Sequence, residues 1–216
     1  MQKFNTAQED FWAGEFGNNY IERNKSIKYL AANIAMFSKI INKTENISSV
    51  IEFGANVGMN LKAIKMLLPE MIAEGIEINK NAFNELSKNS YITAINSSIF
   101  DYKIENQFDL ALIKTVLIHI NPDFLPKAYD ILYQSSKKYI LIAEYYNPTP
   151  VEVTYRGHKG KLFKRDFAGE MMEKYHDLSL IDYGFIYKRD KNYPQDDINW
   201  FLLEKKALPG NDNANI

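Results

Sequence analysis

The sequence predicts an α/β fold, in which a mostly parallel seven-stranded sheet carries helices on both faces and includes an antiparallel strand near the C-terminus. Three observations predict it. Short runs of strand length alternate with segments that repeat apolar residues at helical spacings. These runs are mostly apolar and do not alternate strictly with polar residues, as in parallel strands that are buried on both faces. After Asp166 the pattern changes to two β-rich stretches joined by a polar loop, which is typical of an antiparallel pair.

The first part of the chain predicts a cap and a helix. Residues 1–25 are too aromatic for a solvated tail, so we expect them to pack against the rest of the protein as an N-terminal cap. Residues 26–41 predict a helix that begins at the capping residue Ser26. The helical face expected to be buried, at spacings of three, four and seven, holds Ile27, Leu30, Ala31, Ile34 and Ile41.

Strands and helices then alternate along the chain. The expected strands are residues 49–53, 71–78, 91–96, 108–114 and 139–144, and the expected helices are residues 60–68, a segment capped by Asn79, and residues 126–135. Asp166 is placed to cap a helix at 167–175, and strands are expected at 180–187 and 199–204. We therefore expect one domain over residues 1–206 and a flexible tail at 207–216.

Composition excludes several classes of function. Lys and Arg number 26 and Asp and Glu number 27, so the net charge of −1 argues against a nucleic-acid binder. No apolar run approaches a membrane span, and we expect a cytoplasmic protein without membrane attachment. The absence of cysteine excludes disulfides, Cys-ligated zinc and a cysteine nucleophile. No cluster has the spacing of a metal site, so we expect no metal; composition leaves the oligomeric state open.

The most informative motif lies in residues 50–58. It places Glu52, Gly54, Asn56 and Gly58 on a strand, a turn and a helix start, where backbone N–H groups can approach a polar ligand. A dinucleotide fingerprint fails, because Asn56 and Met59 stand where its second and third glycines belong. The pattern resembles motif I of class I S-adenosylmethionine (SAM)-dependent methyltransferases. That resemblance implies a Rossmann-like fold and SAM as cofactor, with S-adenosylhomocysteine (SAH) as product.

The ends of the next strands extend this resemblance. Glu77 follows the first motif glycine by 77 − 54 = 23 positions and ends a strand, where a carboxylate can accept both ribose hydroxyl hydrogens. Ser97 and Ser98 occupy the position that contacts adenine in this superfamily, which commonly holds an Asp. Lys114 and Thr115 end the fourth strand and are expected beside the cofactor.

Residues 145–165 are expected to form a substrate lid. Five Arg and Lys side chains and no acid fall within residues 156–165, which favours either an anion-binding lid or a solvated loop. The expected substrate-binding residues are Glu144, Tyr146, Tyr155, Arg156 and His158, and the expected cap residues are Trp12, Phe16, Tyr20 and Arg23. Candidate catalytic groups are His158, His119 and Tyr145; packing is the alternative for His119.

A more specific resemblance spans nearly the whole chain. The segments 11–17, 20–24, 144–148, 155–158 and 197–201 are similar to those of the pseudaminic acid biosynthesis-associated methylases. The resemblance implies a SAM-dependent methyltransferase (EC 2.1.1.-) that acts on an anionic sugar or sugar nucleotide of the nonulosonic acid pathway. The alternatives are methylation of another small metabolite or of a protein side chain, and a SAM-binding accessory protein without activity. The departures Asn56 and Ser97 keep the last alternative open.

Overall fold

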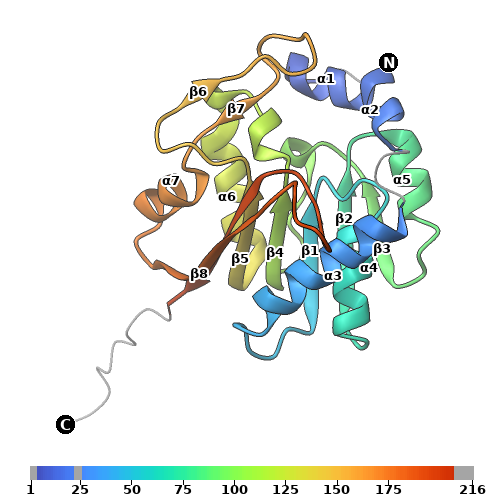
Figure 1. Ribbon diagram of the computed structural model, residues 1–216, viewed down its shortest axis with the longest axis vertical. Helices are drawn as coiled ribbons and strands as arrows, with labels where there is room; N and C mark the ends of the chain where they lie inside the picture. The colour runs from blue at the N-terminus through green and yellow to red at the C-terminus, as the bar shows by residue number, and fades with distance from the viewer. Residues whose placement is uncertain (1–3, 22–25, 207–216) are drawn as a thin grey trace.

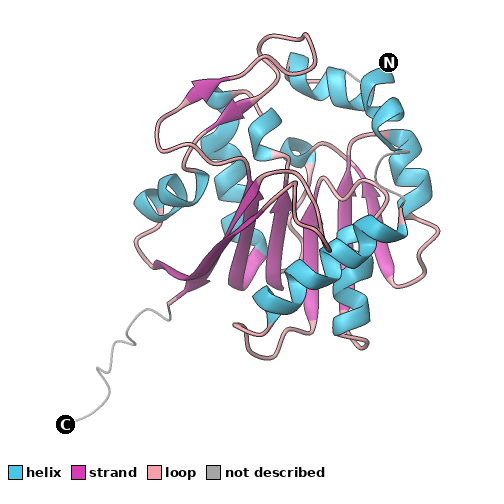
Figure 2. Ribbon diagram, in the orientation of Figure 1, coloured by secondary structure: helices cyan, strands magenta, loops and turns pink. Residues whose placement is uncertain are grey.

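The computed structural model describes residues 4–21 and 26–206. Its centre is a seven-stranded sheet with the strand order β3-β2-β1-β4-β5-β9-β8 (Figures 1 and 2). The strands are β1 (Ser49–Phe53), β2 (Ile72–Glu77), β3 (Ile92–Asn96), β4 (Phe108–Lys114), β5 (Ser136–Glu144), β8 (Leu178–Ile186) and β9 (Ile198–Lys205). The pairs within β3-β2-β1-β4-β5 are parallel, whereas β9 runs antiparallel to both β5 and β8. The predicted fold class is confirmed.

Helices cover both faces of the sheet (Figure 2). The apolar cluster on one face includes side chains of α3 (Ile27–Ile41), α4 (Met59–Leu67) and α5 (Lys80–Leu86), and the cluster on the other face includes side chains of α6 (Leu125–Ser135) and α7 (Phe167–Lys174). The central strands supply alternate residues to the two clusters, so that Ile51 lies in one and Val50 in the other, which explains the mostly apolar runs in the sequence. The bounds of the predicted strands and helices are correct to within three residues. Asn79 and Asp166 cap α5 and α7 as predicted.

The predicted buried face of α3 is correct in part. Leu30, Ile34 and Ile41 are half-buried and pack against the apolar cluster that α3 shares with α4 and α5. Ile27 is 84% exposed, and the residues that are buried are Ala32, Asn33, Met36, Phe37 and Ile40. The apolar pattern omitted Asn33 because it is polar. Its Oδ1 accepts a hydrogen bond from Lys114 Nζ at 3.2 Å, which gives the buried amide oxygen a partner inside the protein.

Two segments lie over the carboxyl end of the parallel strands (Figure 1). The N-terminal cap consists of α1 (Ala7–Ala13) and α2 (Glu15–Tyr20), and residues 145–165 contain a small antiparallel sheet of β6 (Val151–Glu152) and β7 (Phe163–Lys164). Lys161 Nζ donates to the carbonyl of Ala7 at 2.6 Å, so the cap and this lid segment touch. Arg23 and the expected tail at 207–216 lie outside the described residues. None of the helices within the described ranges has the length and apolar character needed to cross a membrane.

Candidate functional site: a cavity beneath the N-terminal cap

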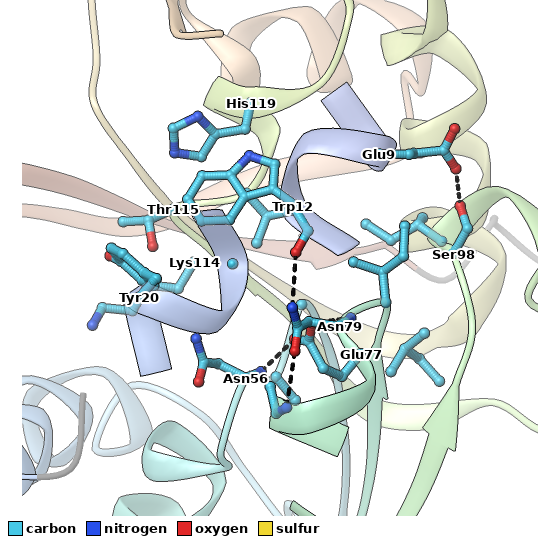
Figure 3. A pocket seen from close by; sticks show the side chains of 18 of the residues that line it. Glu9, Trp12, Tyr20, Asn56, Glu77, Asn79, Ser98, Lys114, Thr115 and His119 are labelled. Atoms are coloured by element: carbon cyan, nitrogen blue, oxygen red, sulfur yellow. Dashed lines mark hydrogen bonds between the residues drawn. The ribbon is translucent and has the colours of Figure 1, made fainter. Parts of the chain in front are cut away.

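A cavity lies where β1, β2 and β4 end and the cap covers them (Figure 3). Its volume is about 1120 Å³ with its open mouth included. The lining comes from the cap, from the segments that follow β1, β2, β3 and β4, and from the start of α4. Cavities of this size and position in α/β sheets are the usual place for a small-molecule ligand.

The turn after β1 has the backbone that its glycines permit. Gly54, Asn56 and Gly58 have φ of 74°, 49° and 83°, in the left-handed region that most side chains disfavour. A Cβ on Gly54 would also lie 2.4 Å from Val116 Cγ2, so no larger residue fits there. Asn tolerates the left-handed region better than most residues, so Asn56 adopts the turn without a glycine.

Glu77 holds this turn from the end of β2. Its side chain is 93% buried and lines the cavity, and its two oxygens accept the N–H groups of Asn56 and Asn79, each at 2.7 Å (Figure 3). Burial raises the pKa of the Glu77 carboxyl above its usual value, and the two N–H donors oppose that shift. A carboxylate has about four lone-pair positions, so two remain for hydroxyl groups of a ligand.

Glu52 lies beneath the cavity and does not line it. Its Oε1 accepts from Asn60 Nδ2 at 2.6 Å, and burial raises its pKa to about 8. Its role here is to hold the start of α4 from below. The sequence placed Glu52 among the cofactor contacts, and the structure instead places Asn60 between Glu52 and the cavity.

The segment after β3 contacts the cap. Ser97 and Ser98 both line the cavity. Ser97 Oγ donates to the carbonyl of Ser98, whereas Ser98 Oγ donates to the carboxylate of Glu9 in α1 (Figure 3). Glu9 is buried and also accepts from the N–H of Thr6 at 2.8 Å. The cap therefore places a buried carboxylate on Ser98, at the side of the cavity where β3 ends.

Lys114 and Thr115 line the cavity at the end of β4. The Lys114 side chain runs toward α3, where Nζ donates to Tyr29 Oη at 2.9 Å and to Asn33 Oδ1 at 3.2 Å. Thr115 has a φ of 56° and its N–H donates to the carbonyl of Ala143, so the chain turns sharply there toward the 3₁₀ turn at Leu117–His119.

Asn79 attaches the cap to the end of β2. Its Nδ2 donates to the carbonyl of Trp12 at 3.2 Å (Figure 3). The same group donates to Asn18 Oδ1 at 2.9 Å. Gly17 lies against the same contact, where a Cβ would meet the Trp12 carbonyl at 1.9 Å. Trp12 and Tyr20 line the cavity, whereas Phe16 packs edge-on against Trp12, with ring centroids 5.3 Å apart, and does not line it.

His119 lines the cavity beside the Trp12 ring, with centroids 4.5 Å apart. Its Nδ1 lies 2.6 Å from the carbonyl oxygen of Lys161. A carbonyl can only accept, so Nδ1 carries the proton and Nε2 keeps a free lone pair in the neutral ring. Burial lowers the pKa of His119 to about 4, so the ring is neutral at physiological pH.

The remaining predicted substrate residues do not line this cavity. Glu144 is 98% buried and accepts the N–H groups of Val116 and Leu117 at 2.9 and 2.8 Å, so its carboxyl stabilises the turn after β4 instead of facing the cleft. Tyr146 packs on Phe201, with centroids 5.8 Å apart, at the outer side of the sheet. The expectation that both side chains face the cleft is therefore corrected.

Tyr155 and His158 lie near the cavity without lining it. Tyr155 packs on His119 with centroids 5.0 Å apart, and His158 packs on Phe11 at 5.1 Å. Arg156, with a φ of 50°, is exposed at the tip of the lid. Tyr145 is half-buried, and burial together with Asp196 raises the pKa of its hydroxyl above its usual value, so the hydroxyl stays protonated and no phenolate is present to act as a base.

Sequence reasoning missed five residues that shape the site. They are Glu9, Tyr29, Asn33, Asn60 and Asn79. Asn79 was predicted as the cap of α5, but its contact with the N-terminal cap was not. Glu9 had a readable signal, because Thr6 and Glu9 form a capping box with the spacing S/T-x-x-E. Tyr29, Asn33 and Asn60 had none, because their positions depend on how α3 and α4 pack on the sheet. Within the ranges that the structure describes, no group of three His, Asp or Glu side chains could hold a metal ion.

Comparisons with known proteins show which solved structures have a similar fold. No protein-family model and no curated protein sequence matches the chain. Among solved structures, a SAM-dependent methyltransferase from Leishmania major has a TM-score of 0.69 at 15% identity, covering 92% of this chain and 81% of its own. The 1,6-didemethyltoxoflavin N1-methyltransferase of Burkholderia thailandensis, solved with its substrate and SAH, has a TM-score of 0.69 at 11% identity, covering 96% and 94%. The magnesium protoporphyrin IX methyltransferase of Synechocystis, solved with SAH, has a TM-score of 0.65 at 11% identity, covering 92% and 97%.

Identities this low establish the fold alone. The substrates named for the two enzymes are chemically unrelated, so the fold does not identify an acceptor. The chain has the Rossmann-like fold of SAM-dependent methyltransferases, with a ligand-sized cavity at the carboxyl end of its parallel strands.

Proposed function

We propose that the chain is a SAM-dependent methyltransferase that binds SAM in the cavity beneath the cap. The observation that carries the proposal is the pairing of Glu77 with the turn of Gly54 and Gly58 in one cavity wall. The turn lets a ligand approach the backbone closely, and Glu77 offers free lone pairs to two adjacent hydroxyl groups. The likeness to enzymes solved with SAH supports the same ligand.

The cavity fits the other parts of SAM as well. Ile78, Ile99 and Phe100 line it next to Ser98 and offer an apolar slot for the adenine ring. Polar groups of Asn60 and Lys114 lie at the opposite side, beyond the turn after β1. A nucleoside with an amino-acid chain matches this order of apolar and polar walls.

The residues above the cavity suit methyl transfer. SAM bound in this cavity would supply an electrophilic methyl group on its sulfonium sulfur for transfer to a nucleophilic oxygen or nitrogen of the acceptor. The cap excludes water from this place, and Trp12 Nε1, which is buried without an acceptor among the described residues, is free to donate to the acceptor molecule. His119 Nε2 accepts the proton that the hydroxyl or amine of the acceptor loses. The proton of a hydroxyl becomes strongly acidic once its oxygen carries the methyl group, so a weak base such as neutral His119 suffices to accept it.

The finer proposal concerns the acceptor, an anionic sugar or sugar nucleotide as the resemblance to the pseudaminic acid-associated methylases implies. The support for it is the positive rim of the lid, where Arg156 and Lys159 are exposed. The other lid cations are engaged elsewhere. Arg165 forms an ion pair with Glu170 at 2.6 Å, and Lys161 donates a hydrogen bond to the carbonyl of Ala7 in the cap. The anion of the acceptor would therefore meet the rim, while its reacting group enters beside His119.

Incubation with isotope-labelled SAM tests both levels of the proposal. Label should pass to an acceptor, and we expect acceptors among nonulosonic acids and their CMP conjugates. Label on none of these sugars, but on another metabolite or a protein in an extract, would refute the sugar acceptor and leave the methyltransferase. Tight SAH binding with no labelled product in any extract would favour an accessory protein. Asn56 no longer favours that alternative, because it adopts the glycine conformation.

A further inference from the structure

Strand β8 ends the seven-stranded sheet, and no described strand pairs with its outer side (Figure 1). The N–H of Tyr183 donates to the side chain of Asp182 at 2.9 Å instead of to a strand. Proteins usually protect such an edge with a proline, a lysine or a bulge. Residues 178–186 contain neither proline nor lysine, and the bulge falls between Leu180 and Asp182. From Asp182 to Ile186 the register with β9 is regular, so this part of the edge can accept another strand.

The same strand and its loop carry a large share of the exposed apolar surface. Six of the eleven large apolar or aromatic side chains that are exposed among the described residues are Leu180, Ile181, Tyr183, Phe185, Tyr187 and Tyr193. Alternate residues of a strand point to one face, so Tyr183, Phe185 and Tyr187 form a row. The ring centroids of Phe185 and Tyr187 are 6.1 Å apart. The three side chains are 66%, 56% and 46% exposed, and such a row on a protein surface marks an interaction site.

The segment from Asp182 to Lys188 is complementary to itself in the antiparallel direction. An acid begins it, a base ends it, and aromatic residues occupy every second position between them. Two copies paired antiparallel about Phe185 place Asp182 of one copy opposite Lys188 of the other. Tyr183 then lies opposite Tyr187, and Phe185 lies opposite itself. Cross-strand pairs of opposite charge and of aromatic rings both stabilise a sheet.

The two end charges remain accessible beside their contacts within one chain. Asp182 Oδ2 lies 3.6 Å from Lys43 Nζ, and Lys188 Nζ lies 3.1 Å from Asp197 Oδ2. The side chains of Asp182 and Lys188 are 32% and 59% exposed, and ion pairs this open contribute little to stability. A carboxylate has about four lone-pair positions and an ammonium group three N–H donors, so both can take a further partner.

The charge and the area of this surface favour a second copy of the chain. The loop after β8 has no net charge to attract an anionic lipid surface, since its bases and acids are Lys188, Arg189, Lys191, Asp190, Asp196 and Asp197. The exposed parts of the apolar side chains within residues 180–187 amount to roughly 500 Å² per copy. A pair of copies would bury up to roughly 1,000 Å² through them, which is the size of a weak, reversible interface.

We infer that β8 pairs antiparallel with β8 of a second copy about Phe185, which joins the two sheets across a two-fold axis. The pairing uses the same surface on both copies, so it closes into a dimer and does not extend into a filament. None of residues 178–198 lines the cavity beneath the cap. The dimer is therefore independent of the proposed function, and a failure of either leaves the other in place.

Sedimentation measures the dimer directly. Wild-type protein at about 100 μM should sediment as a reversible dimer of about twice the 25.0 kDa of one chain. Phe185→Lys places two like charges at the axis and should weaken the dimer at least about 100-fold. Ile72→Lys changes a similarly exposed side chain on β2 and should leave the dimer unchanged. A wild-type monomer would overturn the inference and leave the edge to a different protein chain; a dimer that Phe185→Lys leaves intact would overturn it too.

A disulfide tests the register, because the natural chain has no cysteine. Residues directly opposite each other in an antiparallel pair have Cα atoms about 4.5–5.5 Å apart, within reach of a disulfide. On mild oxidation Phe185→Cys should give a covalent dimer, whereas Ile72→Cys should not.

Reversing the end charges gives an independent test of the same pairing. Lys188→Asp should weaken the dimer, because it sets an acid opposite Asp182 of the second copy, and Asp182→Lys in the same chain should restore it. Equal disulfide yields from Phe185→Cys and Ile72→Cys, or no restoration by the reversed pair, would refute the two-fold pairing.

Discussion

Replacing Asn79 with Asp should release the N-terminal cap while leaving the sheet and its helices folded. The Oδ1 of Asn79 caps α5 by accepting the N–H groups of Asn81 and Ala82 at 3.0 and 3.1 Å, and Asp caps a helix equally well. The Nδ2 group is the part that Asp cannot replace. It faces the oxygens of Asn18 and Trp12, and a carboxylate oxygen there would repel both.

The expected size of the effect follows from the geometry. An amide nitrogen has two hydrogens, so only the two shortest contacts, at 2.9 and 3.2 Å, count fully. At about 0.5–1.5 kcal/mol each, their loss weakens docking of the cap by about 1–3 kcal/mol, which is roughly 5- to 150-fold in its docking equilibrium. Repulsion by the new charge adds to this.

Tryptophan fluorescence reports the release directly. The chain has two tryptophans, and the other, Trp200, is buried on β9, far along the sheet from β2 and α5, where Asn79 lies. Exposure of the Trp12 indole should shift the emission to longer wavelength, and proteolysis within residues 4–21 should accelerate. Asn84→Asp adds the same charge on the exposed side of α5 and should do neither. Unchanged emission and unchanged proteolysis in Asn79→Asp would refute the account of how the cap is held.

Three further predictions concern the carboxylates and the imidazole. Glu77→Ala should weaken SAH binding by about 2–4 kcal/mol in calorimetry, because charge-assisted hydrogen bonds are lost. Glu74→Ala, on the same strand but outside the cavity, should leave SAH binding unchanged. Equal affinities of the two variants would contradict the assignment of Glu77 to the ribose. Glu144 has a pKa of about 8 in the folded chain against 4.5 as its ordinary value, so stability falls by about 1.4 kcal/mol per pH unit as the pH rises between these values. Melting curves of Glu144→Gln should lack that part of the decline, and parallel curves would contradict the buried, protonated carboxyl. The methyl-transfer rate should be flat above pH 6 and fall toward pH 4 as His119 is protonated, and His119→Gln should lower kcat without changing SAH affinity. A variant as fast as the wild type would remove His119 from the reaction.

Much of the fold could be predicted from the sequence because the buried strands are runs of mostly apolar residues. β1 and β4 begin and end at the predicted residues, since every position of β1 and nearly every position of β4 is buried and most of these positions are apolar. The two short cap helices were not predicted as helices. Helices of 7 and 6 residues hold too few turns for a periodic pattern, and tertiary contacts such as those of Asn79 hold them in place.

The site could likewise be predicted only in part. The glycine turn and Glu77 could be predicted, because the positions of a turn and a strand end follow from local sequence. Glu144 could not, because a strand end does not tell whether a carboxylate points into the cleft or back to its own turn; two backbone N–H groups of the turn after β4 decide it. The partners of Lys114 come from α3 and α4, more than 50 residues away in the chain, and only the packed structure brings them together.

Titration of wild-type protein with SAH tests the central claim most directly. The cavity beneath the cap, with Glu77 at one end and Lys114 at the other, predicts saturable binding with one SAH per chain. It also predicts that SAH protects α1 and α2 against proteolysis, because the ligand lies beneath them. Absence of binding by SAH at millimolar concentration, or binding that leaves the cap unprotected, would contradict the account.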